Sequence, residues 1–142
     1  MNRSGLAGWG IMLLRVMVAV IFIVHGGQKL FVYGLGGVGE SFGKMGLPAP
    51  AITAALVAII EFFGGLALLV GFFTRYAALL IAAVMTGAVL LVHLNKGFFV
   101  SSGGFEFALL LLVASLTLAM AGPGALSIDG SRRNASGFAR GR

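Results

Sequence analysis

The sequence predicts an all-α protein, an integral membrane four-helix bundle with both termini in the cytoplasm. The first observation is composition: of 142 residues, 59% are hydrophobic and 10% are charged, and the mean hydropathy is +1.06. A soluble domain of this size cannot bury so much apolar surface. The second is that four apolar stretches approach the roughly 20 residues that a helix needs to cross about 30 Å of hydrocarbon. The third is the unequal distribution of Lys and Arg between these stretches.

The predicted spans follow one another within a single domain, residues 1–130. None of them alternates apolar and polar residues as a strand would, so a barrel is not expected. The first is not interpreted as a removable signal peptide, because Arg15 interrupts its apolar run. The four spans are Trp9–Leu30, Ala51–Phe73, Tyr76–Leu94 and Phe105–Ala121.

The connections between the spans differ in length. Thr74 and Arg75 alone separate the second and third spans, which predicts a tight antiparallel hairpin. The connector 31–50 is long and rich in glycine, and a flexible loop is one interpretation of it. The other is a short helix lying in the membrane interface, because apolar residues recur in it at helical spacing. These residues are Leu35, Val38, Phe42 and Met45.

The flanking charges predict the orientation. With an even number of spans, both termini and the hairpin lie on one side of the membrane, and that side receives most of the basic residues. The tail 131–142 is basic and without apolar periodicity, so we expect it to be disordered and drawn to anionic lipids rather than to nucleic acid. The cytoplasmic side would hold Arg3, Arg75, Arg132, Arg133, Arg140 and Arg142, and the other side Lys29, Lys44 and Lys96.

Glu61 lies in the middle of the second span, where a charge is unfavourable. Carboxylates inside membranes usually face the bundle and have a partner. Counting at 1.5 Å per residue from the predicted span ends places Arg15 near enough in depth to be that partner. Two interpretations remain: a buried ion pair that fixes helix registry, or a site for a ligand or proton.

Further titratable residues gather near one mouth of the predicted bundle. His25 and Lys29 share a face of the first span with Arg15. His93, Lys96 and Glu106 reach a similar depth from the last two spans. No metal is expected, because the histidines lack H-x-x-x-H or E-x-x-H spacing and the lysines would repel a cation. The sequence contains no cysteine, so it carries no thiol chemistry of its own.

Taken in order along the chain, these residues resemble the DoxX family of small bacterial four-helix membrane proteins. The resemblance rests on the arginine within the first span, "HGGQKL", the mid-span glutamate followed by "GGLALLVGFFTR", and "GGFEFALLLL". It extends from Arg15 to Gly130 and implies a multi-pass protein of the bacterial cytoplasmic (inner) membrane. The corresponding polar and glycine positions are Arg15, His25, Gly26, Lys29, Glu61, Gly65, Arg75 and Glu106.

The resemblance implies a redox-associated membrane subunit. Some family members are described as membrane subunits of a thiosulfate:quinone oxidoreductase, and others as membrane partners of thiol or superoxide-detoxifying proteins in redox homeostasis. We therefore expect the bundle to bind a quinone between its helices or to serve a partner oxidoreductase, and to be at most a membrane subunit of such an enzyme. Arg15 and Glu61 would supply a hydrogen bond and a proton to a quinone oxygen.

Two other functions are compatible with the same residues. One is a small proton or anion transporter, in which the cationic mouth attracts solutes, and four short helices would then need to form a homo-oligomer. The other is a non-catalytic membrane scaffold in which Arg15 and Glu61 only fix the helices. In each case membrane lipids surround the chain.

Overall fold

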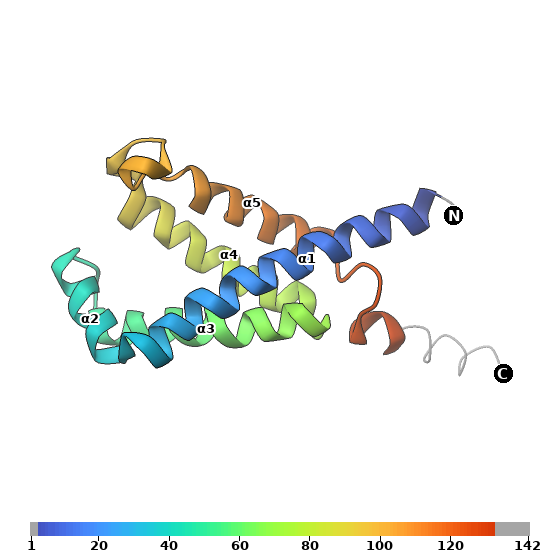
Figure 1. Cartoon of the computed structure of the whole chain (residues 1–142), viewed down its shortest axis with the longest axis horizontal. Coiled ribbons are helices and arrows are strands. Elements are labelled where there is room, and N and C mark those ends of the chain that lie inside the picture. Colours follow the sequence, from blue (N-terminus) through green and yellow to red (C-terminus); the bar gives the residue numbers. More distant parts are fainter. Residues whose placement is uncertain (1–2, 133–142) are drawn as a thin grey trace.

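The computed structural model describes residues 3–132, and these residues form helices without any strand (Figure 1). The prediction of an all-α fold is therefore confirmed for this part of the chain. The long helices are α1 (Arg3–Gly27), α3 (Pro50–Val70), α4 (Thr74–Gly87) and α5 (Glu106–Ala121), and α2 (Gly34–Lys44) is shorter. Two π-helical segments, η1 (Gln28–Val32) and η2 (Ala88–His93), extend α1 and α4, and η3 (Leu94–Lys96) and η4 (Val100–Ser102) are 3-10 turns.

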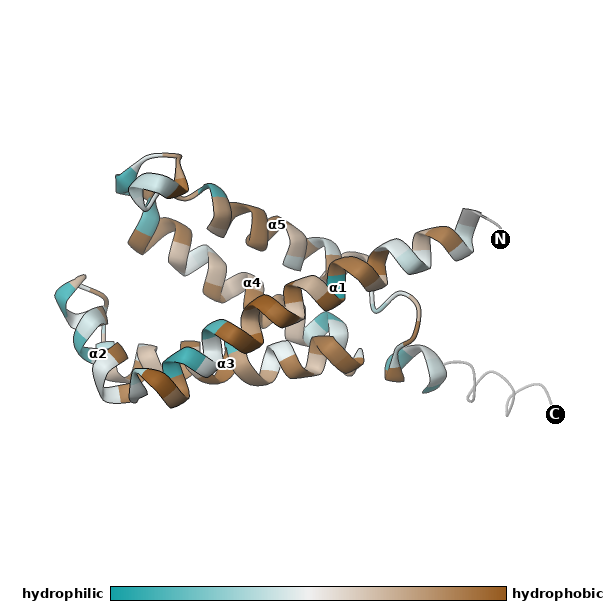
Figure 2. Ribbon diagram, in the orientation of Figure 1, coloured by the Kyte–Doolittle hydropathy of each residue, from teal (hydrophilic) through white to brown (hydrophobic). Residues whose placement is uncertain are grey.

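Three helical stretches within residues 3–132 are long and apolar enough to cross a membrane. They cover Ser4–Val32, Pro50–Val70 and Thr74–Lys96, with 29, 21 and 23 residues. Helix α5 is equally apolar but has 16 residues, so the fourth predicted span stays a prediction. Hydrophobic and intermediate residues predominate along the long helices, and hydrophilic residues lie at the connection between α4 and α5, on α2 and at a few positions of α1 (Figure 2).

The helices are arranged as two pairs that share one end. Helix α1 packs along α3, and α4 packs along α5 (Figure 1). A hairpin of three residues, 71–73, joins the pairs, and its sharp reversal puts Gly71 and Phe73 in the left-handed region, at φ 68° and 46°. The predicted tight hairpin is present, but Thr74 and Arg75 are the first residues of α4 and not the connection. Helix α2 packs against the opposite end of α3. The predicted connector helix is therefore present, and we call its end of the bundle the α2 end.

Two glycines allow α1 and α3 to approach closely. A Cβ atom at Gly26 would collide with the backbone of Phe62, and one at Gly65 would lie 2.9 Å from the backbone nitrogen of Ile23. Neighbouring side chains such as Phe22 are almost completely buried. Small residues permit this spacing because helices in lipid associate mainly through packing. The crossing fixes the register between the two helices that carry the polar residues.

The C-terminal segment 122–132, which we call the strap, returns across the other end of the bundle. The amide of Ala125 donates to the carbonyl of Gly8 at 2.9 Å. The carboxylate of Asp129 accepts from the amides of Phe73 and Thr74 at 3.0 and 2.9 Å, and so caps the start of α4. The strap thus ties α1 to the hairpin. Of the predicted basic tail 131–142, residues 133–142 lie outside the described residues.

Candidate functional site

Glu61, which is buried, forms an ion pair with the partly buried Lys29. The Lys29 Nζ lies 2.5 Å from Glu61 Oε2, and the two side chains are 18% and 5% exposed. Helix α3 supplies the carboxylate and η1 supplies the ammonium group. The close crossing at Gly26, less than one turn before Lys29, brings the two elements together. The carboxylate expected inside the membrane is therefore present and neutralised, but not by the expected residue.

The predicted pair between Arg15 and Glu61 is wrong. Arg15 is 1% exposed and donates to two strap carbonyls, to Pro123 O at 2.5 Å and to Leu126 O at 2.8 Å. The physical reason is that the irregular strap leaves carbonyls without helical partners, and a guanidinium with five N–H groups satisfies them. The predicted pairing compared only positions along the helical spans, so the strap carbonyls were not among the partners considered for Arg15. Arg15 belongs to the strap end, and Glu61 to the α2 end.

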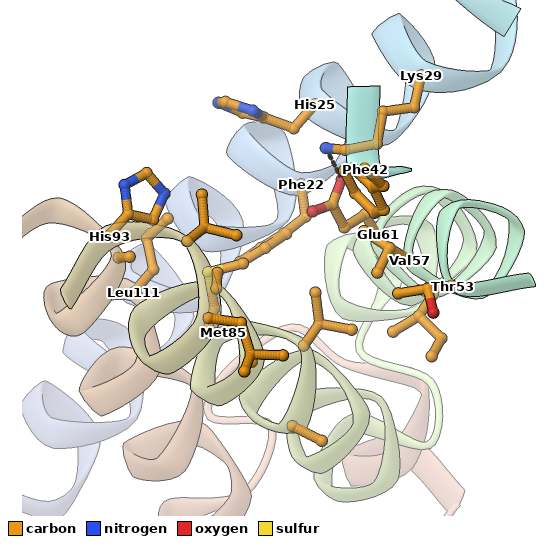
Figure 3. Close-up of a pocket in the computed structure, with 18 of the residues that line it drawn as sticks. Phe22, His25, Lys29, Phe42, Thr53, Val57, Glu61, Met85, His93 and Leu111 are labelled. Atoms are coloured by element: carbon orange, nitrogen blue, oxygen red, sulfur yellow. Dashed lines mark hydrogen bonds and ion pairs between the residues drawn. The ribbon is translucent and has the colours of Figure 1, made fainter. Parts of the chain in front are cut away.

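A cavity of about 490 Å³ adjoins the ion pair, and we call it the main cavity (Figure 3). It lies between the two helix pairs, with walls from α1, η1, α2, α3, α4, η2, η4 and α5. Most of its lining is apolar, including Phe22, Val57 and Met85. The polar side chains of the lining are His25, Lys29, Thr53, Glu61 and His93. A mostly apolar cavity with a few converging polar groups is typical of small-molecule sites.

The two histidines lie on facing walls of the main cavity. His25 projects from α1, and His93 lies at the end of η2 (Figure 3). His93 Nδ1 is 2.7 Å from the carbonyl oxygen of Gly103. Because a carbonyl can only accept, Nδ1 carries the hydrogen, and Nε2 of the neutral ring is then an acceptor. The predicted involvement of both histidines stays a prediction, but the fold does bring them to the cavity of Glu61.

Glu106, the remaining predicted site residue, lies apart. Its Oε1 accepts from the amide of Val100 at 2.7 Å and so closes the loop 97–105 at the start of α5. Glu106 is not part of the main-cavity lining formed by the described residues. Lys96 likewise does not line the main cavity.

Some lining residues were not predicted from the sequence. Phe42 comes from α2, whose placement against α3 the spacing could not give, and Thr53 is an unremarkable polar residue near the start of α3. The Lys29–Glu61 pair had a usable signal in Gly26 and Gly65, which mark the close crossing. The π-helical geometry of η1 and η2 has no sequence signature, although such turns are frequent at functional sites.

A metal centre is not indicated. Among the described residues, no group of three or more His, Cys, Asp or Glu residues is placed to hold an ion. The residues of the main cavity instead offer one ammonium group, one carboxylate and two imidazoles in an apolar setting. Such groups can bind and protonate an oxygen of an apolar ligand.

Comparisons with known proteins cover most of the chain. The DoxX family model matches residues 10–94. A Bacillus subtilis (strain 168) protein named "Putative oxidoreductase CatD" is 38% identical over 120 residues, which are 84% of each chain. "Inner membrane protein YqjF" of Escherichia coli (strain K12) is 37% identical over 120 residues, 84% of this chain and 89% of that one. "Inner membrane protein YphA" of the same organism is 29% identical over 124 residues, 84% and 87% of the two chains. No solved structure matches significantly.

Proposed function

This chain belongs to the DoxX family, and on that premise we propose that it is a redox-associated membrane subunit whose main cavity binds a quinone for a partner oxidoreductase. The chain is a multi-pass protein of the bacterial cytoplasmic (inner) membrane, in contact with its lipids. The observation that carries the proposal is the apolar main cavity with the partly buried Lys29–Glu61 pair in its wall. The name of the relative CatD supports the redox assignment.

The polar groups of the main cavity suit a ring that carries oxygen atoms. A quinone is reduced to a quinol by two electrons and two protons. The Lys29 ammonium group has N–H donors for a quinone oxygen beyond the one directed at Glu61. His25 and His93 can each hold a proton near the ligand. Since the chain has no cysteine, the electrons come from a redox centre of the partner protein.

The rim of the main cavity supports a route from the lipid. Leu56 of α3, Leu80 of α4 and Leu91 of η2 line it and are 55%, 53% and 58% exposed. In a membrane these exposed leucines face hydrocarbon rather than water. A lipid-soluble ligand can therefore reach the cavity between the helix pairs and leave its apolar tail in the bilayer.

The topology proposal is four crossings with both termini in the cytoplasm. The described chain begins and ends toward the same end of the bundle (Figure 1), as an even number of crossings requires. Helix α5 is about 24 Å long at 1.5 Å per residue, so it would cross with local thinning of the bilayer. A fluorescent protein fused after Arg142 would be bright if the C-terminus is cytoplasmic. A dark, exported fusion would contradict this topology.

Direct binding tests the quinone proposal. We would purify the chain, place it in lipid nanodiscs and measure decylubiquinone binding by equilibrium dialysis. Wild type should bind, and Glu61→Gln should weaken binding at least tenfold, because the ion pair that orients Lys29 is lost. The matched control is Glu106→Gln, which changes a carboxylate outside the main-cavity lining and should bind as wild type does. Equal binding by all three proteins, or no binding by wild type, would contradict the proposal.

A further inference from the structure

A second cavity of about 390 Å³ lies beside the main cavity, between the end of α1 and α2. It is lined by His25, Gln28, Lys29, Tyr33, Gly37, Val38, Ser41 and Phe42. We infer that this second cavity is a water-filled vestibule through which protons pass between the Lys29–Glu61 site and the aqueous phase at the α2 end. The vestibule itself stands on the structure alone, while its use for ligand protonation rests on the proposed function.

The lining of the second cavity is suited to water. Gln28, Tyr33 and Ser41 place amide and hydroxyl groups around it, in addition to His25 and Lys29. A buried water needs two to four polar partners and about 30 Å³ of space, so the cavity has room and partners for several waters. The main cavity contrasts with it, because most of that lining is Leu, Val, Ile, Phe or Ala. The two neighbouring spaces therefore differ in what they hold: water in one and an apolar ligand in the other.

Lys29 stands at the boundary between the two cavities. His25, Lys29 and Phe42 line both of them. The exposed fraction falls from 18% at the Lys29 side chain to 5% at the Glu61 side chain, so the lysine is the more accessible member of the pair. A lysine in this position separates water from the apolar ligand while touching both. The polar lining of the vestibule leads from there along η1 to α2.

His25 is the group that can carry a proton across this boundary. Its side chain is exposed and belongs to both linings. In the transfer, a hydronium ion in the vestibule gives its proton to the neutral imidazole and becomes water. The imidazolium then gives a proton to the ligand oxygen and returns to the neutral state. The electrons that accompany this proton reach the ligand from the reduced centre of the partner protein.

Cysteine labelling tests whether the vestibule holds water, and the natural chain offers a cysteine-free background. Val38 is 6% exposed and lines the vestibule, whereas Ala58 is 0% exposed and lines neither of the two cavities within the described residues. We would treat Val38→Cys and Ala58→Cys in proteoliposomes with a charged, membrane-impermeant methanethiosulfonate. Val38→Cys should react at least tenfold faster. Equal protection of both cysteines would overturn the vestibule.

A plug in the vestibule tests its use by protons. Gly37 lines the vestibule and Gly36 does not, and a Cβ atom at either meets no described atom within 4 Å. Gly37→Trp should prevent labelling of Val38→Cys, while Gly36→Trp, the matched control, should leave it unchanged. With decylubiquinone bound and reduced methyl viologen as the reductant, which gives up electrons without releasing protons, Gly37→Trp should slow proton uptake at least tenfold and preserve the Kd of the quinone. Stopped-flow measurement with a pH-indicator dye gives that rate.

The outcomes separate the vestibule from the proposed function. Unchanged proton uptake in Gly37→Trp, with labelling prevented, would overturn the proton route. If decylubiquinone does not bind wild type, the proton role falls together with the quinone proposal. Fast labelling of Val38→Cys would in that case still support a water-filled vestibule, and protection would overturn it.

Discussion

Arg15, which is buried, and Lys29, which is partly buried, are two cations on the same continuous helical stretch, and their surroundings differ completely. Arg15 lies at the strap end, where its N–H groups meet the main-chain carbonyls of Pro123 and Leu126. Lys29 lies at the α2 end, where its partner is the carboxylate of Glu61 and both face a cavity. A buried charge in a membrane helix therefore does not by itself indicate a ligand site. The neighbouring space and the nature of the partner distinguish a structural cation from a functional one.

The strap end is consolidated by several independent contacts. Asp129 caps the start of α4, and the Arg75 guanidinium donates to the carbonyl of Ala119 at 3.1 Å. Toward the α2 end, by contrast, the two helix pairs diverge (Figure 1). We therefore expect substitutions at the strap end to act on stability, and substitutions at the α2 end to act on ligand binding.

The largest expected effect is that of Arg15→Met. The substitution removes two charge-assisted hydrogen bonds and leaves buried strap carbonyls without donors. At about 1.5–3 kcal/mol for each bond, the free energy of unfolding should fall by about 4 kcal/mol. Unfolding in mixed micelles with increasing dodecyl sulfate, followed by circular dichroism, measures it. Lys96→Met is the control for an exposed cation, and a loss no larger than in that control would contradict the structural role.

A smaller loss of stability is expected for Gly26→Leu, together with a loss of binding. The new side chain would collide with the Phe62 backbone and force α1 away from α3, so Lys29 and Glu61 would separate. Overpacking of this kind costs up to about 3 kcal/mol. Gly10→Leu is the control on the same helix, since no described atom lies within 4 Å of a Cβ there. Stability is measured by the same unfolding in mixed micelles, and binding by dialysis with decylubiquinone. Unchanged binding in Gly26→Leu would mean that the close crossing of α1 and α3 is not needed for the binding site.

The third effect is the coupling between Lys29 and Glu61. A double-mutant cycle of Lys29→Met, Glu61→Gln and the double variant should give a coupling energy of about 2 kcal/mol, because each single change leaves a buried group without its partner. The double variant should regain stability without regaining decylubiquinone binding. If the double variant regained both stability and decylubiquinone binding, the ion pair would have a structural role only.

The smallest effect is expected for the ion pair between Glu40 and Lys44 on α2. Lys44 Nζ lies 2.7 Å from Glu40 Oε1, but the side chains of Glu40 and Lys44 are 69% and 75% exposed. Lys44→Gln should therefore change the free energy of unfolding by less than about 0.5 kcal/mol. A larger fall in the free energy of unfolding in the same micelle assay would mean that burial does not explain the difference in stability contribution between this pair and the Lys29–Glu61 pair.

Sequence reasoning predicted the helical class, the tight hairpin and the presence of a charged partner for Glu61. These depend on apolar runs and on the cost of charge in lipid, which a sequence shows directly. It did not predict the partner of Glu61, because the rotation of α1 against α3 is set by packing at Gly26. It did not predict the strap either, since carbonyl acceptors such as that of Pro123 have no side-chain signature. The cavity depends on how two helix pairs diverge, which no local pattern encodes.

The most direct measurement is native mass spectrometry of the protein extracted gently from its own membrane. Wild type, Glu61→Gln and the control Glu106→Gln would be compared for every molecule that copurifies. We predict a quinone mass on wild type and on Glu106→Gln, and its absence from Glu61→Gln. A quinone bound equally to all three, or only ordinary phospholipids on each, would contradict a quinone site at the Lys29–Glu61 pair.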